Sequence, residues 1–229
     1  MNEKTLTHNN KFNKGAKDFE TWFNNNEILF KSELKALKKM LRDPENCLSV
    51  GIGNGLFANK LGIKQGIEPS EGMANLAREK GIKVIEGRAE DLPVADNSYK
   101  QVLLGTILAY VDNKEKAVRE AYRVLKKGGE AIISILPAEG SYAILYKLAE
   151  SKGYYDLEIT PEYPYPLEFV EGTNWITTEK LIAMMKETGF KDLEFIQTLT
   201  RHPRYSNKEV EEAIPGYKKG DYVVVKGVK

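Results

Sequence analysis

The most constraining feature of the sequence is a run of alternating glycines directly after a short apolar segment. Gly51, Gly53 and Gly55 follow the apolar residues 47–50 and precede an amphipathic stretch at 56–61. Glycine reaches positive φ without strain and has no Cβ, so the chain can turn sharply and bring backbone N–H groups close to a ligand. The following helix directs its positive N-terminus at an anion in the turn. The run therefore predicts a strand, a turn and a helix that bind a nucleotide-type cofactor.

The residues around the glycines narrow the class of cofactor. A phosphate-binding P-loop has Lys and Ser or Thr after its last glycine, whereas Leu56 and Phe57 stand there. A dinucleotide fingerprint of the form G-x-G-x-x-G would need a third glycine at position 56. The residues after the last glycine therefore disfavour a nucleoside triphosphate as the ligand, and the glycine spacing argues weakly against NAD.

An acid lies at the end of the next expected strand. Residues 64–68 are expected to form a second short strand that ends in Glu68, and a helix is expected from about Ser70 to Lys80. An acid at the tip of the second strand of a βαβ unit accepts hydrogen bonds from two ribose hydroxyls. The alternative is a solvated glutamate at a strand end. Ser70 is expected to cap the helix and Gly81 to close it.

Length and composition limit the class of protein. The 229 residues suffice for one large α/β domain, and a formal net charge of +1 gives no electrostatic footprint for nucleic acid or a membrane surface. Cys47 is the only cysteine and His8 and His202 the only histidines, so no metal site is expected. The polar N-terminus and the lack of a long apolar run predict a cytoplasmic protein. We expect a small-molecule substrate, and the oligomeric state stays open.

Residues 47–136 alternate between strand and helix patterns, which predicts a doubly wound parallel sheet. Further strands are expected at 82–86, 99–104 and 130–136. A helix capped by Asp112 is expected to run to Lys127 and to end at Gly128 and Gly129.

The C-terminal part predicts a helix and two final strands. The helix is expected to open at Thr177 or Thr178 and to close at Gly189, and the strands to span 193–199 and 221–226. Such a closing pair usually forms an antiparallel hairpin at the edge of the sheet. The predicted fold is therefore α/β, with a mostly parallel seven-stranded sheet whose last strand is antiparallel.

Two segments flank this pattern. Residues 18–46 predict one or two amphipathic helices, which pack on the core and are candidates for a lid; they include Trp22. Residues 137–176 are rich in aromatic side chains, among them Tyr142 and Tyr146. They either form a substrate wall that binds by stacking or cation–π contacts, or only cap the sheet.

Four ordered segments carry a resemblance to a known family. They are the glycine turn with Glu68-Pro69-Ser70, residues 87–93, residues 96–99 and residues 119–129. The chain resembles class I S-adenosylmethionine-dependent methyltransferases of the small-molecule type grouped with type 11 and ubiquinone/menaquinone-biosynthesis enzymes. The resemblance implies a Rossmann-like methyltransferase fold over residues 1–229, with the cofactor core at 47–136, a substrate-side insertion at 137–176 and a closing unit at 177–229.

The resemblance also implies site residues. The glycines would approach the methionine portion, Glu68 the ribose, residues 89–90 the adenine, and residues 105–106 the methyl group. The expected cofactor-binding residues are Ser49, Gly51, Ile52, Gly53, Gly55, Glu68, Pro69, Ala89, Glu90, Gly105 and Thr106. The chain departs from the family at Ser49, where an acid is usual, and at Arg88, where Asp is usual and where a guanidinium cannot accept a hydrogen bond from adenine.

The chemistry needs no nucleophilic residue, because a sulfonium methyl group is already activated and the acceptor has only to be held about 3 to 3.5 Å away. No catalytic residue is identified by the sequence; Tyr110 and His202 are the candidates for a base. The expected substrate-side residues are Trp22, Tyr110, Tyr142 and Tyr146.

Absent motifs also limit the substrate. No Asn/Asp-Pro-Pro-aromatic motif follows the fourth strand, and Cys47 lies within a strand, so methylation of DNA bases is disfavoured. The competing hypotheses are a non-catalytic cofactor-binding or partner subunit and, less favoured, a nicotinamide-dependent oxidoreductase.

Overall fold

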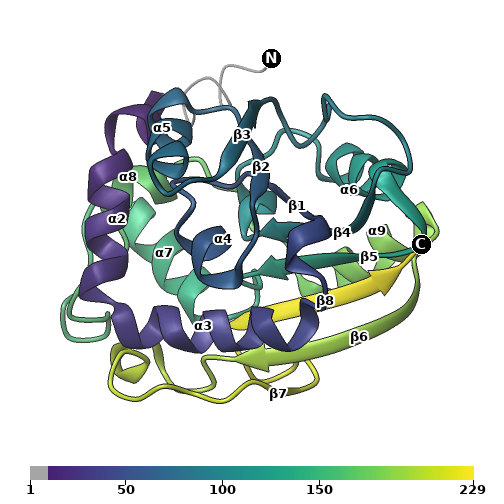
Figure 1. Cartoon of the computed structure of the whole chain (residues 1–229). Helices are drawn as coiled ribbons and strands as arrows, with labels where there is room; N and C mark the ends of the chain where they lie inside the picture. Colours follow the sequence, from purple (N-terminus) through teal and green to yellow (C-terminus); the bar gives the residue numbers. More distant parts are fainter. Residues whose placement is uncertain (1–9) are drawn as a thin grey trace.

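The computed structural model describes residues 10–229, in which an eight-stranded sheet has the order β3-β2-β1-β4-β5-β8-β6-β7 (Figure 1). The strands are β1 (Cys47–Val50), β2 (Gln65–Glu68), β3 (Lys83–Glu86), β4 (Tyr99–Gly105), β5 (Leu125–Ile135), β6 (Lys191–Thr198), β7 (Ile214–Pro215) and β8 (Tyr222–Val228). Strands β1 to β5 pair in parallel, and β8 is antiparallel to both of its neighbours. The predicted α/β sheet is confirmed. The polar start of the chain and His8 lie outside the described residues.

The helices begin and end largely at the expected local signals. They are α2 (Ala16–Asn25), α3 (Glu27–Met40), α4 (Leu56–Leu61), α5 (Glu71–Glu79), α6 (Lys114–Val124), α7 (Ser141–Lys152), α8 (Leu167–Val170) and α9 (Thr178–Thr188), with 3-10 turns η1 (Pro44–Asn46), η2 (Ile107–Ala109) and η3 (Pro203–Tyr205). The Ser70 hydroxyl accepts a hydrogen bond from the Met73 N–H, and the Thr177 hydroxyl accepts one from the Lys180 N–H. Gly189 ends α9 in the left-handed conformation. The caps predicted at Ser70, Thr177 and Gly189 are confirmed.

The helix before β5 differs from the prediction at both ends. Asn113, rather than Asp112, caps α6 by accepting a hydrogen bond from the Lys116 N–H. The helix ends at Val124, and Gly128 and Gly129 lie inside β5. The cause is tertiary, because the chain turns extended at Leu125 to pair with β4 before it reaches the glycines.

The end of the sheet also differs from the prediction. The expected antiparallel pair forms between β6 and β8, but β8 lies inside the sheet between β5 and β6. The two-residue strand β7, which the sequence analysis missed, pairs with β6 at the edge. Val223 and Val225 face one core cluster and Val224 faces the other, so both faces of β8 are buried. A strand that is apolar on both faces is typical of a sheet interior.

The sheet separates two hydrophobic cores, because successive side chains of a strand point to opposite faces. On β4, Leu103 belongs to the cluster with α2, α3, α4 and α7, while Val102 and Leu104 belong to the cluster with α6 and α9. On β5, Ile132 belongs to the first of these clusters and Ile133 to the second. Figure 1 shows α3 lying along β8 and β6.

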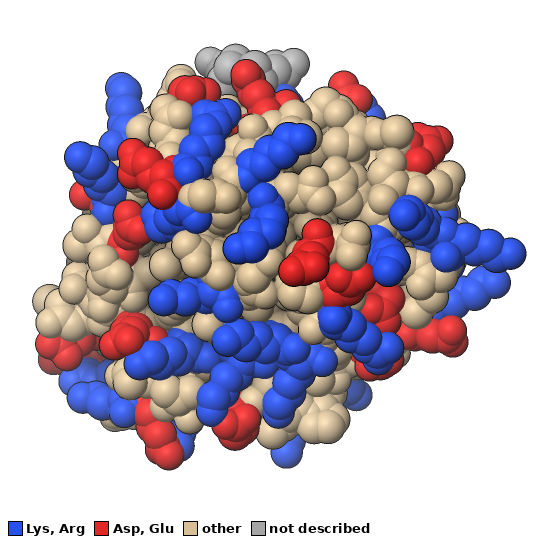
Figure 2. Space-filling model, viewed as in Figure 1, with Lys and Arg blue, Asp and Glu red and all other residues tan. Residues whose placement is uncertain are grey.

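Basic side chains gather over α3, which the balanced overall charge does not reveal. Lys31, Lys35, Lys38 and Lys39 follow one another along this helix, and Figure 2 shows Lys and Arg side chains across its outer face. Lys31 pairs with the nearby Glu27. The inner face of α3 carries buried residues and packs against the sheet. Among residues 10–229, no helix is both long and apolar enough to cross a bilayer.

Arg123 on α6 anchors the loop between β3 and β4. Its guanidinium donates to the carbonyl oxygens of Leu92 (2.9 Å) and Val94 (3.0 Å) and pairs with Glu120. We expect Arg123→Met to lower the free energy of unfolding by about 2 kcal/mol, because two carbonyls lose a charged donor. For a chain of this size the midpoint then falls by about 4 to 8 °C in thermal unfolding. Arg119→Met, on the exposed face of the same helix, is the control and should shift the midpoint by less than about 2 °C. Equal shifts for the two variants would contradict the anchoring role.

Candidate active site

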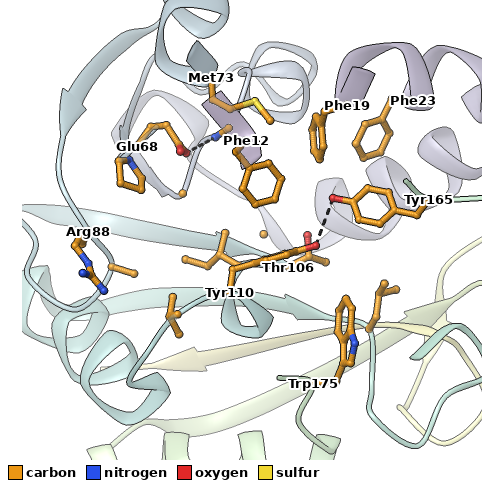
Figure 3. Close-up of a pocket in the computed structure, with 18 of the residues that line it drawn as sticks. Phe12, Phe19, Phe23, Glu68, Met73, Arg88, Thr106, Tyr110, Tyr165 and Trp175 are labelled. Carbon is orange, nitrogen blue, oxygen red and sulfur yellow. Dashed lines mark hydrogen bonds between the residues drawn. The ribbon is translucent and has the colours of Figure 1, made fainter. Parts of the chain in front are cut away.

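One cavity opens where β1, β2 and β4 end, and it encloses about 1160 Å³ of empty space, its open mouth included. A polar part is formed by the ends of these strands, and an aromatic part by the N-terminal helices and residues 110–175. In the view of Figure 3, Glu68 and Arg88 lie at one end and Tyr165 and Trp175 at the other. The polar part contains most of the residues that were expected to bind the cofactor: Gly51, Gly53, Glu68, Pro69, Ala89, Glu90, Gly105 and Thr106.

The glycine turn presents open backbone to this cavity. Gly51 and Gly53 have φ values of 63° and 58°, which glycine adopts without strain. A Cβ on Gly51 would lie 2.5 Å from Cγ2 of Ile107, so this position is closed by packing. A Cβ on Gly53 would meet nothing within 4 Å. The turn therefore leaves free space at Gly53, directly beside the carboxylate of Glu68.

Glu68 links the glycine turn to the start of α5. Its Oε2 accepts a hydrogen bond from the Gly53 N–H at 2.8 Å, and its Oε1 accepts one from the Ser70 N–H at 3.1 Å. Burial raises the pKa of the Glu68 carboxyl to about 7, and the two N–H donors oppose this rise. The ionised carboxylate therefore becomes the main form only near neutral pH.

The other expected cofactor residues lie behind the cavity wall. Ser49 is buried in β1 between β2 and β4, and the Ile52 N–H donates to the Ile67 carbonyl. Gly55 starts α4, where a Cβ would lie 3.0 Å from the Ala77 backbone. The structure thus places Ser49, Ile52 and Gly55 outside the lining, where they shape the turn.

Arg88 lines the cavity and is held by two acids. Its guanidinium contacts Oδ2 of Asp112 at 2.9 Å and Oε1 of Glu90 at 3.3 Å. The same Glu90 oxygen accepts a hydrogen bond from the Asp112 N–H at 2.8 Å. Arg88 thus ties the loop after β3 to the start of α6, and the Glu90 oxygen that it contacts is already engaged.

Aromatic side chains from distant parts of the chain form the other end of the cavity. Trp22 donates from its indole N–H to the Tyr163 carbonyl at 3.0 Å, and the Tyr110 hydroxyl donates to the Tyr165 hydroxyl at 3.3 Å. Of the expected substrate-side residues, Trp22, Tyr110 and Tyr146 line the cavity. Tyr142 does not, and its hydroxyl is hydrogen-bonded to Ser206. The other aromatic lining residues are Phe19 and Phe23 of the expected helical segment, Tyr165 and Trp175 of the expected aromatic segment, and Phe12, which the sequence analysis did not single out.

The structure does not bring the two candidate bases together. Tyr110 lines the cavity, and burial raises the pKa of its hydroxyl to about 12, so that it keeps its proton at neutral pH. His202 lies in the exposed connection after β6, where its Nδ1 accepts a hydrogen bond from the Arg204 N–H. His202 is outside the cavity lining.

Glu33 is a lining residue that the sequence analysis missed. It lies on the inner face of α3, is 7 % exposed, and has no hydrogen-bond donor among residues 10–229. Burial raises the pKa of its carboxyl to about 8. A glutamate in a lysine-rich helix is easily taken for a solvent-facing residue. The signal was its spacing, because Leu29, Glu33 and Leu37 are four residues apart and share the buried stripe.

The fold and the cavity define a Rossmann-like enzyme that binds a nucleoside-containing cofactor, and comparison with known proteins identifies the family. A methyltransferase domain model matches residues 48–133. A Thermotoga maritima crystal structure described as an S-adenosylmethionine-dependent methyltransferase superposes with a TM-score of 0.85 at 35 % identity, covering 95 % of this chain and 98 % of that one. The chain belongs to the S-adenosylmethionine-dependent methyltransferases.

Curated proteins are also similar to this chain. An uncharacterized protein of Methanocaldococcus jannaschii is 34 % identical over 96 % of this chain and 99 % of its own length. The ubiquinone/menaquinone biosynthesis C-methyltransferase of Klebsiella pneumoniae is 28 % identical over 55 % of each chain. The protein is therefore an enzyme that uses S-adenosylmethionine. The site's own residues fit that cofactor, because the space at Gly53 and the Glu68 carboxylate suit a ribose and a backbone-bound anion.

The buried Glu33 carboxyl makes stability depend on pH. Its folded pKa lies above the ordinary value, so its contribution is favourable at low pH and is lost as pH rises from about 5 through about 8. We expect Glu33→Gln to unfold near the wild-type midpoint at pH 5 and several degrees above it at pH 9. Glu27→Gln, at an exposed position of the same helix, should give a difference that does not change over this range. A Glu33→Gln difference that stays constant with pH would contradict the assignment.

Proposed function

We propose that this protein transfers a methyl group from S-adenosylmethionine to a small molecule bound among the aromatic side chains. The observation that carries the proposal is the continuity of one cavity from Gly53 and Glu68 to Tyr165 and Trp175. The Thermotoga relative is described as a possible histamine N-methyltransferase, which supports a small acceptor. The C-methyltransferases share only about half of their length with this chain, so they do not indicate the acceptor atom.

In this proposal the polar part holds the cofactor. Glu68 accepts the ribose hydroxyls, the turn at Gly53 approaches the methionine portion, and residues 89–90 flank the adenine. Gly105 and Thr106 lie next to the reacting methyl group. Thr106 has a φ of 54°, and its N–H donates to the Ser134 carbonyl at 3.0 Å. A non-glycine residue held in this region is strained, and such strain is concentrated at functional sites.

The aromatic part contributes orientation and exclusion of water. The aromatic side chains hold the acceptor in line with the methyl group, an effect that contributes about 7 to 11 kcal/mol at best. Residues 18–46 supply Phe19, Trp22 and Phe23 to the wall and act as the lid, while residues 137–176 supply the opposite side. Residues 1–229 would form one methyltransferase domain, cytoplasmic, with neither nucleic acid nor membrane as a partner.

Ligand binding tests the proposal first. We expect S-adenosylmethionine or S-adenosylhomocysteine at 100 times its dissociation constant to add about 2.7 kcal/mol to stability. The unfolding midpoint should then rise by about 5 to 10 °C, with no shift from NADH. A shift with NADH alone would support the oxidoreductase alternative. Binding of S-adenosylmethionine without transfer of its labelled methyl group to any pool of acceptors would support the alternative of a non-catalytic subunit.

Glu68→Gln tests the ribose contact. We expect S-adenosylhomocysteine to bind at least tenfold more weakly, because an amide has one acceptor oxygen where the carboxylate has two. Glu71→Gln, an exposed position at the start of α5, is the matched control and should keep the wild-type affinity. Calorimetry measures both, and equal affinities for the two variants would contradict the assignment.

The pKa of Glu68 predicts a pH dependence of the same contact. Ribose hydroxyls donate to the ionised carboxylate, so affinity should rise about tenfold between pH 6 and pH 8, through the pKa of about 7. 5′-Methylthioadenosine is the suitable probe, because it has the ribose but no titrating amino group. Glu68→Gln should remove the dependence, and a wild-type affinity that is flat with pH would contradict this role.

A further inference from the structure

Glu33 lies where a carboxylate normally needs a hydrogen-bond donor or a counter-ion. It lies on the inner face of α3, lines the aromatic part of the cavity, and is more than nine-tenths buried. An ionised carboxylate removed from water without a hydrogen bond or a counter-ion destabilises a protein. No Lys, Arg or His among residues 10–229 pairs with it. The carboxyl group is therefore open to a ligand in the cavity.

The groups around Glu33 cannot neutralise it. The titratable side chains that interact electrostatically with Glu33 are Tyr142 and Tyr146 on α7 and Tyr222 on β8. Burial raises the pKa of each of these hydroxyls. The Tyr222 hydroxyl donates to Ser134, and the Tyr142 hydroxyl is bonded to Ser206. The lysines of α3 lie on its outer face, as Figure 2 shows for the helix as a whole. The surroundings of Glu33 thus consist of neutral phenols, and Glu33 is the acidic group among them.

The walls beside this carboxyl group are aromatic. Tyr146 lies with its ring centre 6.0 Å from that of Tyr165 and 5.9 Å from that of Trp175, and Trp22 lies 5.0 Å from Tyr165. All four line the cavity. The faces of aromatic rings carry negative potential and attract cations. The rings and the carboxylate therefore favour the same kind of ligand, a cation with an apolar body.

We propose that the methyl acceptor is an amine, whose nitrogen is hydrogen-bonded to the Glu33 carboxylate while the aromatic side chains enclose its apolar body. This inference rests on the proposed methyl transfer and names the class of acceptor. A carboxylate ligand is repelled by Glu33 once this side chain is ionised, above its pKa of about 8. An alcohol of the same shape carries no charge, so its hydrogen bond to Glu33 lacks the ion pairing that an ammonium group adds.

The same carboxylate gives the amine a route to its reactive form. The bound ammonium group transfers one proton to Glu33, and the nitrogen lone pair attacks the methyl carbon. The C–N bond forms as the C–S bond breaks, and the electron pair of that bond goes to sulfur, which becomes a neutral thioether. The product leaves as a methylated ammonium ion, and Glu33 releases its proton to water. With a pKa of about 8, this carboxyl is closer in basicity to an alkylamine, at about 10.4, than an exposed glutamate is.

A binding experiment with probe molecules tests the proposal, whatever the natural acceptor is. The probes are two amines, 2-phenylethylamine and cyclohexylamine, and their isosteric alcohols, 2-phenylethanol and cyclohexanol. Each is titrated by calorimetry into the protein saturated with S-adenosylhomocysteine. At least one amine should bind, and at least tenfold more tightly than its alcohol. Transfer of labelled methyl from S-adenosylmethionine should follow the same preference.

Variants of one helix then test the role of Glu33. Glu33→Gln should weaken amine binding at least tenfold and leave the affinities for S-adenosylhomocysteine and for the alcohols unchanged. Glu33→Asp keeps the charge and should retain part of the preference for amines. Glu27→Gln, exposed on the same helix, should match the wild type. Thermal unfolding verifies that each variant is folded.

The outcomes separate the two proposals. Amines that bind no better than alcohols, no binding of either amine to the loaded protein, or a Glu33→Gln variant with unchanged amine affinity would overturn the assignment of an amine acceptor. Each of these results leaves methyl transfer itself intact. Failure to bind S-adenosylhomocysteine would instead contradict the proposed function. The same amine and alcohol titrations of the free protein would then test the role of Glu33 separately.

Discussion

Parallel pairing of β1 with β2 on one side and β4 on the other positions the whole polar part of the cavity. Ser49 lies opposite Gly66 of β2 and opposite Leu103 of β4, so the three strands end at the same edge. Gly66 permits this register, because a Cβ there would lie 2.7 Å from the Ser49 carbonyl oxygen. The turn after β1, the acid of β2 and the strained Thr106 after β4 meet as a consequence.

The aromatic part of the cavity depends on a different kind of contact. Residues 16–40 and 137–176 are far apart in the sequence and meet through ring packing and through the Trp22 hydrogen bond to Tyr163. Edge-to-face ring pairs contribute about 0.5 to 1.5 kcal/mol each beyond their buried area. The aromatic part of the cavity therefore exists only when both segments have docked on the sheet, whereas the polar part is built into the sheet itself.

Two buried carboxyl groups, Glu68 and Glu33, face the cavity from its two parts, and burial raises the pKa of each. Glu68 is held by backbone N–H groups, and Glu33 has no donor among the described residues. Titratable groups with perturbed pKa values concentrate at functional sites, since the desolvation that destabilises the charge also strengthens its interaction with a ligand. The structure therefore tolerates a local loss of stability at both ends of the cavity.

By itself, the sequence determined what depends on neighbouring residues: the glycine turn, the acid that ends β2, and the caps at Ser70, Thr177 and Gly189. These are decided by backbone freedom and short-range hydrogen bonds, which a linear pattern records. Only the tertiary structure decided that β8 lies inside the sheet, that α6 stops at Val124, that Arg88 pairs with Asp112, and that Glu33 rather than Tyr142 faces the cavity. Each of these outcomes depends on which distant surfaces bury one another, and the burial of a side chain is a property of the packed fold.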